Sequence, residues 1–437
     1  MSRLQDLGQK IDAREARIGI IGLGYVGLPL AIEFAKEGFR VTGFDLDSEK
    51  IRQLTESRSY IEDVPAADVA EARAKQRFDA TTDFGRLSQM DVINVCVPTP
   101  LTKTKDPDMS FIARAVEEIR KRLRGGQLVI LGSTTYPGTT HELFVPILEQ
   151  SGLECGKDFA VAFAPERIDP ANKSFKVRNV PKVVGGESAL CTELAVKAYQ
   201  PIFDKVVPVS SSQAAELVKL LENTFRAINI GLANEVALMC HRLGLDVWEV
   251  IEAAATKPYG FMKFLPGPGL GGHCIPVDPT YLSWKMKSLN FSARFIELAT
   301  EINGHMPDHV AERVGDLLNE ERLPVNGSRI LILGVAYKPD VSDMRESPAL
   351  DVIKLLRGKG GNVSYHDPHV AELELDGSTL KSVDLTDDAL ATADIVVIVT
   401  DHSGVDYDRV VRLSQRVFDT RNATRSVSGG REKIRKL

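Results

Sequence analysis

One cysteine stands in a segment that contains the residue types for covalent chemistry. The segment GPGLGGHCIPVDP (residues 267–279) holds Cys274, four glycines and three prolines, with Asp278 four positions after the cysteine. Glycine and proline at this density are incompatible with a regular helix or an interior strand, so we expect a loop whose backbone approaches a ligand closely. A lone cysteine is usually a buried, inert residue. A nucleophilic role for Cys274 therefore depends on what the rest of the chain supplies.

The segment GLGYVG contains the glycine spacing of a dinucleotide site. It lies within residues 16–45, where a β-branched run, a glycine turn, an amphipathic stretch and the second run FRVTGFD form a βαβ pattern. Gly22 permits the tight turn, Gly24 lets the backbone approach a pyrophosphate, and Gly27 allows close packing of helix on strand. The N-terminus of the following helix would then face the phosphates.

Asp45 ends the second run, 45 − 22 = 23 positions after Gly22. A carboxylate there hydrogen-bonds the ribose hydroxyls of NAD and repels the extra phosphate of NADP, so the sequence favours NAD. Arg52 keeps NADP as an alternative cofactor, and the glycine motif alone does not distinguish NAD from FAD. With NAD present, the Cys274 thiol could attack an aldehyde to form a thiohemiacetal, and loss of hydride would convert this adduct to a thioester.

Two α/β regions and a helical middle must position these residues. Strand-like runs at 91–99, 126–134 and 159–166 alternate with helical stretches such as 111–123, which predicts a parallel, doubly wound sheet. Residues 212–244 predict a long helix whose apolar face could pair with a second subunit, and further helices follow to about residue 318. A second α/β pattern covers 328–340, 347–361, 362–368, 394–402 and 415–422, and we expect the polar tail 424–437 to be frayed.

Composition excludes several classes of protein. The 437 residues are 43% hydrophobic and 26% charged, with a formal net charge of −6, which argues against a general nucleic-acid binder. No apolar run reaches the length of a membrane span, and the N-terminus lacks the apolar core of a secretory signal, so we expect a cytoplasmic protein without membrane contact. The five cysteines contain no C-x-x-C pair, which predicts neither a disulfide framework nor a metal site.

Eight segments give the chain a resemblance to a known family. GLGYVGLPLA, VCVPTPL, STTYPGTT, APER, ELVKLLENTFRAINIGLANE, PGPGLGGHCIPVDP, GVAYKPDVSDMRESPAL and TDH occur in this order between about residues 16 and 422. They resemble the signatures of the UDP-glucose/GDP-mannose dehydrogenase family of nucleotide-sugar 6-dehydrogenases. KPYGFMKFLPGPG and DPTYLSWK look most like the UDP-N-acetylglucosamine 6-dehydrogenase branch. The resemblance implies that the C6 hydroxyl of a UDP-hexosamine is oxidised twice to a carboxylate while two NAD are reduced.

The resemblance also implies a role for each site residue. Cys274 would be the nucleophile; Lys219 and Asn223, which share one helix face, would donate to the developing oxyanion. Asp278 and Thr134 would position the water or base of the first oxidation, and Glu166 would assist thioester hydrolysis. Tyr25, Val26 and Arg345 would join the glycines and Asp45 at the cofactor. The remaining substrate contacts would come from Arg167, Lys257, Lys263, Gly271, Tyr337 and Lys338. Lys257 and Lys263 could reach the substrate across a dimer interface.

Ordinary structural explanations exist for the same residues. Lys219 could be a solvated helix charge, Asp278 could stabilise a turn beside Pro279, and the charges from Lys338 to Glu346 could pair among themselves. The resemblance implies three parts: an NAD-binding Rossmann-like domain (1–208), a central helical and dimerisation domain with the cysteine loop (209–318), and a UDP-sugar-binding Rossmann-like domain (319–437). A homodimer or higher homo-oligomer follows from the long apolar helix.

Two departures from the family pattern bear on the substrate. Gly132 stands where relatives commonly carry glutamate or lysine, which leaves details near the nicotinamide open. APERIDPAN (164–172) lacks the second glutamate of the UDP-glucose branch, which favours an N-acetylated sugar. UDP-glucose, UDP-N-acetylgalactosamine and UDP-N-acetylmannosamine remain alternative substrates. Outside this reaction, a two-electron dehydrogenase of the 6-phosphogluconate type would not need Cys274, and a non-catalytic nucleotide-sugar sensor or scaffold would need no turnover.

Overall fold

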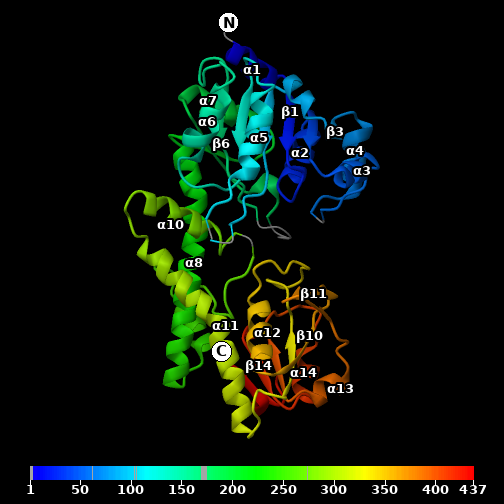
Figure 1. Ribbon diagram of the computed structural model, residues 1–437, viewed down its shortest axis with the longest axis vertical. Helices are drawn as coiled ribbons and strands as arrows, with labels where there is room; N and C mark the ends of the chain where they lie inside the picture. The colour runs from blue at the N-terminus through cyan, green and yellow to red at the C-terminus, as the bar shows by residue number, and fades with distance from the viewer. Residues whose placement is uncertain (1–2, 62, 103, 105, 169–174, 273) are drawn as a thin grey trace. The chain divides into compact units, whose positions relative to one another are not determined.

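The chain forms two compact units, each built around a twisted sheet. The computed structural model in Figure 1 describes all residues except 1–2, 62, 103, 105, 169–174 and 273. One unit comprises Met1–Glu222 and Thr280–Asn290, and the other comprises Asn223–Pro279 and Phe291–Leu437. The division into three domains at residues 208 and 318 stays a prediction. No helix in the described part of the chain is long and apolar enough to cross a membrane.

An eight-stranded sheet forms the centre of the first unit. Its spatial order is β3-β2-β1-β4-β5-β6-β7-β8, and every neighbouring pair is parallel except β6 and β7. The strands are β1 (Arg17–Ile21), β2 (Arg40–Phe44), β3 (Phe78–Thr81), β4 (Val92–Val95), β5 (Leu128–Leu131), β6 (Ala160–Phe163), β7 (Lys182–Gly186) and β8 (Val206–Pro208). The sequence predicted the parallel strands β1, β2, β4, β5 and β6 but not β3, β7 or β8.

Helices cover both faces of this sheet. Ile20 and Ile21 of β1 point to opposite faces and belong to two separate hydrophobic clusters, which is the arrangement of a doubly wound fold. The helices are α1 (Arg3–Asp12), α2 (Gly27–Lys36), α3 (Ser48–Thr55), α4 (Ala66–Ala74), α5 (Ser110–Arg120), α6 (Val145–Glu149) and α7 (Ala189–Tyr199), with short helical turns η1 (Phe84–Gln89), η2 (Thr140–Phe144) and η3 (Val177–Asn179). These data and the second sheet below confirm the predicted fold class.

Long helices follow the first sheet along the chain. They are α8 (Ser212–Leu243), α9 (Val247–Ala255), α10 (Asp278–Ser288) and α11 (Arg294–Glu320). The 32 residues of α8 extend about 48 Å at 1.5 Å per residue, as the absence of proline predicted. The close approach of α8 and α11 favours glycine at position 231, because an added Cβ would lie 3.3 Å from the Ala299 Cα, closer than an ordinary contact. This helix carries two of the predicted catalytic side chains.

A second, five-stranded sheet lies in the second unit and is parallel throughout. Its order is β10-β9-β13-β14-β15. The strands are β9 (Arg329–Leu333), β10 (Asn362–His366), β13 (Ile395–Ile398), β14 (Val417–Asp419) and β15 (Ile434–Lys436); α12 (Pro348–Gly358), α13 (Asp387–Thr392) and α14 (Tyr407–Leu413) accompany them, with η4 (Arg431–Lys433) before β15. An antiparallel hairpin of β11 (Glu372–Leu375) and β12 (Ser378–Lys381) stands apart from this sheet.

The prediction of a frayed C-terminal tail is wrong. Residues 434–436 form β15, which pairs with β14 at the edge of the sheet. The Lys433 Nζ donates to the Arg412 and Ser414 carbonyls at 3.0 Å each, where α14 ends, and the Leu437 side chain is buried. Helix-terminal carbonyls lack partners within their helix, so a lysine there satisfies them. The polar composition of the tail concealed this anchoring.

The same type of hydrogen bond joins the amino ends of two neighbouring strands in each sheet. In the first unit, the Asp91 Oδ2 accepts from the Arg17 N at 2.9 Å, which joins the starts of β4 and β1. In the second unit, the Asp394 Oδ2 accepts from the Arg329 N at 2.7 Å, which joins the starts of β13 and β9. The two sheets are therefore built on the same local plan around their central strands.

Candidate active site

The glycine turn after β1 has the backbone geometry of a dinucleotide site. Gly22 adopts a φ of 89°, and a Cβ at this position would lie 2.5 Å from the Cys96 carbonyl oxygen. A Cβ on Gly27 would lie 1.8 Å from the Gly22 carbonyl oxygen, so the start of α2 requires glycine as well. Around Gly24, by contrast, no heavy atom lies within 4 Å of an added Cβ. The open side at Gly24 leaves room for a pyrophosphate against the backbone.

The residues around this turn fit NAD. Helix α2 begins after Val26 without a side-chain cap and has no acidic residue in its first turn, so its N–H groups and dipole remain suited to an anion. The Asp45 Oδ2 accepts from the Leu23 N at 2.9 Å, which fixes the carboxylate beside the turn. Arg52 was the residue that kept NADP as an alternative cofactor. Its guanidinium donates to Glu49 on the same helix and to Glu56 directly after that helix. Tyr25 is 55% exposed.

Glu166 follows β6 and is held as a carboxylate. Its Oε1 accepts from the Arg167 N at 2.8 Å and the Ile168 N at 2.9 Å, and its Oε2 lies 3.3 Å from the Lys182 Nζ. Burial opposes ionisation, but the Lys182 ammonium and the two backbone amides together lower the pKa of Glu166 below its ordinary value. An ionised carboxylate of this kind can act as a base toward water.

Thr134 lies in the loop after β5, and the buried side chain of Glu216 accepts hydrogen bonds from this loop. The Glu216 Oε2 accepts from the Gly138 N at 2.5 Å, and its Oε1 accepts from the Thr140 N at 2.8 Å and the Thr140 Oγ1 at 2.6 Å. Glu216 belongs to α8 and is fully buried. Burial raises its pKa to about 7 despite these donors. Sequence reasoning missed Glu216; its place three residues before Lys219 on a predicted helix was the available signal.

Cys274 lies half-buried in the turn that leads into α10, and three predicted residues meet there. The Cys274 carbonyl accepts from the Val277 N at 3.1 Å and the Asp278 N at 2.8 Å. The Asp278 side chain is buried, and its Oδ2 accepts from the Asn223 Nδ2 at 2.5 Å. Asp278 therefore opens a helix rather than a simple turn, and the structure brings Cys274, Asp278 and Asn223 together. Lys219 lies one turn before Asn223 on α8 and is buried rather than solvated.

The glycines of the cysteine loop allow it to pack against another loop. Gly272 adopts a φ of 87°, and a Cβ on it would lie 2.9 Å from the Tyr337 Cε2. A Cβ on Gly271 would lie 2.8 Å from the Tyr337 Cβ. The Gly272 N also donates to the Arg345 carbonyl at 3.1 Å. The predicted substrate contacts Gly271 and Tyr337 are thus direct neighbours.

The start of the same loop is tied to α8 by a buried amide. The Asn234 Oδ1 accepts from the Gly267 N at 2.9 Å, and the Asn234 Nδ2 donates to the Asn303 Oδ1 at 2.8 Å. A Cβ on Gly267 would lie 2.4 Å from an Arg421 guanidinium nitrogen, so a larger residue here would displace the end of the Arg421 side chain. Sequence reasoning did not single out Asn234 or Arg421, because it cannot pair residues that are distant in the chain.

The other predicted contact residues have protein partners of their own. Arg167 forms an ion pair with Glu222 at 2.5 Å, and Arg345 forms one with Asp343 at 2.6 Å. Lys263 pairs with Glu252, and the Lys257 Nζ lies 4.9 Å from the centre of the Tyr259 ring. The Lys338 Nζ lies 5.5 Å from the centre of the Tyr337 ring. In the segment APERIDPAN, residues 169–172 lie outside the described residues. Ligand contacts by all these side chains stay predictions, as does any effect of Gly132.

Sequence comparison assigns the chain to a family over most of its length. The models of the UDP-glucose/GDP-mannose dehydrogenase family match residues 16–203 (NAD binding domain), 213–305 (central domain) and 331–426 (UDP binding domain). The chain belongs to this family. It is an NAD-dependent UDP-sugar dehydrogenase, which confirms the predicted family, the enzyme class and the cofactor.

Named relatives extend over most of the chain. A UDP-N-acetyl-D-glucosamine 6-dehydrogenase of Pseudomonas aeruginosa is 37% identical over 360 residues, which is 82% of this chain and 84% of the relative. A UDP-N-acetyl-D-mannosamine dehydrogenase of Pyrococcus horikoshii is 36% identical over 388 residues, which is 88% of this chain and 89% of the relative. The solved structure of the UDP-D-ManNAc dehydrogenase from Pyrococcus horikoshii superimposes with a TM-score of 0.87 at 33% identity, covering 96% of this chain and 99% of that one.

Proposed function

We propose that the chain oxidises the C6 hydroxyl of UDP-N-acetylglucosamine to a carboxylate and reduces two NAD for each sugar, with Cys274 as the nucleophile. The observation that supports a covalent step is the set of contacts that joins the turn of Cys274 to Asp278 and then to Asn223 on α8. The choice of sugar rests on the resemblance of residues 257–269 and 278–285 to one branch of the family and on the Pseudomonas aeruginosa relative. The Pyrococcus horikoshii relative keeps UDP-N-acetylmannosamine as the alternative.

The first stage converts the alcohol to an aldehyde. Asp278 and Thr134 position the water or base that takes the proton from the C6 hydroxyl. NAD would be held by the glycine turn, the start of α2 and Asp45, and would supply the hydride acceptor. Because each NAD accepts one hydride, a second NAD would have to replace the first NADH before the later Cys274 adduct is oxidised. The Asn223 amide carries two N–H groups, and because one donates to Asp278, the other serves the substrate oxygen.

The second stage proceeds on the cysteine. The Cys274 thiolate attacks the aldehyde carbon, the new S–C bond forms, and the carbonyl electron pair moves to oxygen, where Lys219 and Asn223 stabilise it. Loss of hydride from this thiohemiacetal gives the thioester. The Glu166 carboxylate then takes a proton from water, the water oxygen attacks the thioester, and the C–S bond breaks with sulfur leaving as thiolate. One water is consumed, and the sugar leaves as the carboxylate.

The decisive experiment counts NADH formed for each sugar consumed, using a panel of UDP-sugars. Two NADH with UDP-N-acetylglucosamine and little reaction with UDP-glucose is the expected result. The same stoichiometry with only another UDP-sugar would keep the mechanism and replace the substrate. One NADH would mean that oxidation stops at the aldehyde, and binding without NADH would indicate a sensor.

Replacement of Cys274 tests the covalent step separately. Cys274→Ala should abolish formation of the carboxylate, whereas Cys155→Ala, a change of a half-buried cysteine in the first unit, should leave it intact. Full four-electron turnover by Cys274→Ala would refute the thioester, whereas an unchanged rate with only one NADH for each sugar would favour the two-electron type of enzyme.

We also infer a homo-oligomer from the surface of α8. Its exposed apolar side chains are Leu217, Leu221, Phe225, Leu232, Met239 and Leu243. Such a run on one helix is typical of a subunit interface. Sedimentation velocity at micromolar concentration should show a dimer or larger species, and a monomer would overturn this inference. The cytoplasmic location stays a prediction.

A further inference from the structure

Asp367 holds the same place in the second sheet that Asp45 holds in the first. Asp367 directly follows β10, and its Oδ2 accepts from the Val335 N at 2.7 Å. Val335 comes one residue after Gly334, the glycine that follows β9 and begins the turn. In the first unit the Asp45 Oδ2 accepts from the Leu23 N, again one residue after the turn glycine Gly22. The second unit therefore repeats the strand–turn–carboxylate arrangement of a nucleotide-binding βαβ unit.

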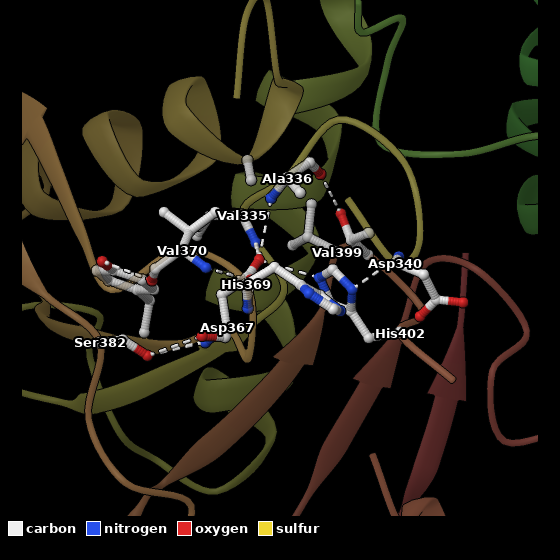
Figure 2. A network of polar contacts seen from close by, with 12 residues as sticks. Val335, Ala336, Asp340, Asp367, His369, Val370, Ser382, Val399 and His402 are labelled. Atoms are coloured by element: carbon white, nitrogen blue, oxygen red, sulfur yellow. Dashed lines mark hydrogen bonds and ion pairs between the residues drawn. The ribbon is translucent and has the colours of Figure 1, made fainter. Parts of the chain in front are cut away.

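The two carboxylates differ in what surrounds them. The Asp367 side chain is fully buried, and Figure 2 shows it at the centre of a polar network. Its Oδ2 also accepts from the Ala336 N at 3.1 Å and lies 3.0 Å from the His402 Nε2, while its Oδ1 accepts from the His369 N at 2.8 Å and the Val370 N at 3.1 Å. Burial opposes ionisation, but these donors lower the pKa of Asp367 to about 2. The carboxylate is directed into the protein rather than toward a ribose.

His402 connects this carboxylate to the far end of the β9 turn. It is 1% exposed, and its Nδ1 accepts from the Asp340 N at 3.0 Å. Because a backbone N–H only donates, Nδ1 carries no proton, and the proton on Nε2 is donated to Asp367. His402 thus bridges Asp367 and Asp340 as a neutral side chain in one tautomer (Figure 2).

Two further bonds hold the same turn. The Thr400 Oγ1 donates to the Ala336 carbonyl at 2.6 Å, and the Ser403 N donates to the Asp340 Oδ1 at 2.9 Å. Asp340 itself has a φ of 60°, a left-handed conformation that is uncommon for residues other than glycine and that aspartate adopts more readily than most. Residues 335–340 are therefore fixed at both ends, and Tyr337 and Lys338 lie between the fixed points.

We propose that Asp367 and His402 are positioning residues that fix the turn 335–340, so that Tyr337 and Lys338 are held in place for the UDP part of the substrate. This inference rests on the proposed function, which assigns the contacts of those two side chains. Because Tyr337 also packs on Gly271 and Gly272, the same turn supports the loop that carries Cys274. The buried dyad acts through the turn and does not touch the substrate.

A metal ion at the same place explains the contacts less well. Asp340, His369 and His402 offer three ligand atoms within 4.8 Å of one another. However, the Nδ1 lone pair of His402 accepts from the Asp340 N, and Nε2 carries the proton that bonds Asp367. An ion would have to displace the bond at Nδ1. The geometry points to a hydrogen-bonded brace.

The test measures UDP binding by calorimetry, together with the KM values for the UDP-sugar and for NAD, on the full-length enzyme. His402→Leu removes both hydrogen bonds, whereas His402→Gln restores one donor and one acceptor. Thr400→Val removes only the bond to Ala336 and keeps a β-branched side chain of similar shape. The matched control is Asp394→Asn, which alters the carboxylate at the opposite end of the same sheet.

We expect His402→Leu to weaken UDP binding by about tenfold or more and to raise the KM for the UDP-sugar, with the KM for NAD unchanged. His402→Gln should recover most of the loss, Thr400→Val should show a smaller change in the same direction, and Asp394→Asn should bind UDP normally. If His402→Leu does not fold, the UDP affinity and KM values of Thr400→Val and His402→Gln are compared with those of wild type instead.

Three results would overturn the proposal. The first is UDP affinity unchanged in every folded variant, even where thermal stability falls. The second is an equal loss for UDP and NAD. The third is a wild-type enzyme whose UDP affinity depends on added Zn²⁺ or falls with EDTA, because an ion would then do the work of the brace. A wild-type enzyme that binds no UDP at all would instead refute the proposed function.

Discussion

Replacing Glu216 with glutamine should remove a pH dependence that the buried carboxylate imposes on the first unit. Burial raises the pKa of Glu216 from its ordinary 4.5 to about 7. The folded chain therefore binds the proton more tightly than the unfolded chain, and stability falls as pH rises from 4.5 through 7 and is constant above that. At about 1.4 kcal/mol for each pH unit, the full effect is about 3 kcal/mol.

The variant separates this effect from the loss of hydrogen bonds. A glutamine amide offers one acceptor oxygen where the carboxylate offers two, so at least one of the three donors from Gly138 and Thr140 loses its acceptor at every pH. That cost is constant and shifts the whole curve. The slope between pH 5 and pH 8 is what changes: wild type should lose about 2 to 3 kcal/mol more across this interval than Glu216→Gln.

Tryptophan fluorescence can report on this unit alone. The chain has two tryptophans; Trp284 belongs to the first unit, with its ring centre 5.1 Å from that of Tyr136 in the loop that Glu216 holds, and Trp248 belongs to the second. Urea unfolding in a Trp248→Phe background gives the free energy of unfolding at each pH. Glu193→Gln, a change of an exposed carboxylate on α7, serves as the control. Parallel curves for wild type and Glu216→Gln, within about 0.5 kcal/mol, would refute the reasoning.

Two other changes test the buried contacts of the site. Lys182→Met leaves the Glu166 carboxylate without its buried partner and should destabilise the chain by about 3 kcal/mol at pH 7. Because Lys182 lowers the pKa of Glu166, the loss should shrink as pH falls through 4.5, and urea unfolding that shows an equal loss at pH 4 and pH 7 would contradict this. Gly272→Ala places a Cβ 2.9 Å from Tyr337 at a positive φ and should cost about 1 to 3 kcal/mol and most of the turnover. Gly304→Ala, where a Cβ meets no atom within 4 Å, is the control in thermal melts and NADH assays, and equal effects of the two changes would count against the packing argument.

Local patterns in the sequence predicted the parts of the fold that depend on neighbouring residues. The glycine spacing of residues 22–27 and the carboxylate of Asp45 define a turn that the structure reproduces, because the steric demands of that turn involve residues next to one another in a βαβ unit. The length of α8 also followed from local signals, namely the absence of proline and the helical spacing of apolar residues. Strands β7 and β8 and the anchoring of β15 could not be predicted in this way, because each depends on a partner distant in the chain.

Buried polar pairs were the main omission at the site. Glu166 and Lys182, Glu216 and Thr140, and Asn234 and Gly267 are each separated by more than ten residues. A sequence shows that a lysine or an asparagine is present, but not which side chain it meets when water is excluded. The alternative of a solvated Lys219 is wrong for the same reason, whereas the alternative of local pairing near Lys338 is met by the ion pair of Arg345 with Asp343.

Asp45 and Asp367 show why a motif alone does not define a nucleotide site. Both follow the second strand of a βαβ unit and accept from the amide that follows the turn glycine. The neighbours of the two carboxylates differ: the His402 Nε2 lies 3.0 Å from Asp367, whose side chain is fully buried, whereas the Lys50 Nζ lies 3.5 Å from Asp45, whose side chain keeps 12% of its surface exposed. The same arrangement therefore lies in the NAD-binding part of the first unit, and in the second unit we propose that it braces a turn. The residue that distinguishes Asp367 from Asp45 is therefore His402, which comes from the segment after β13.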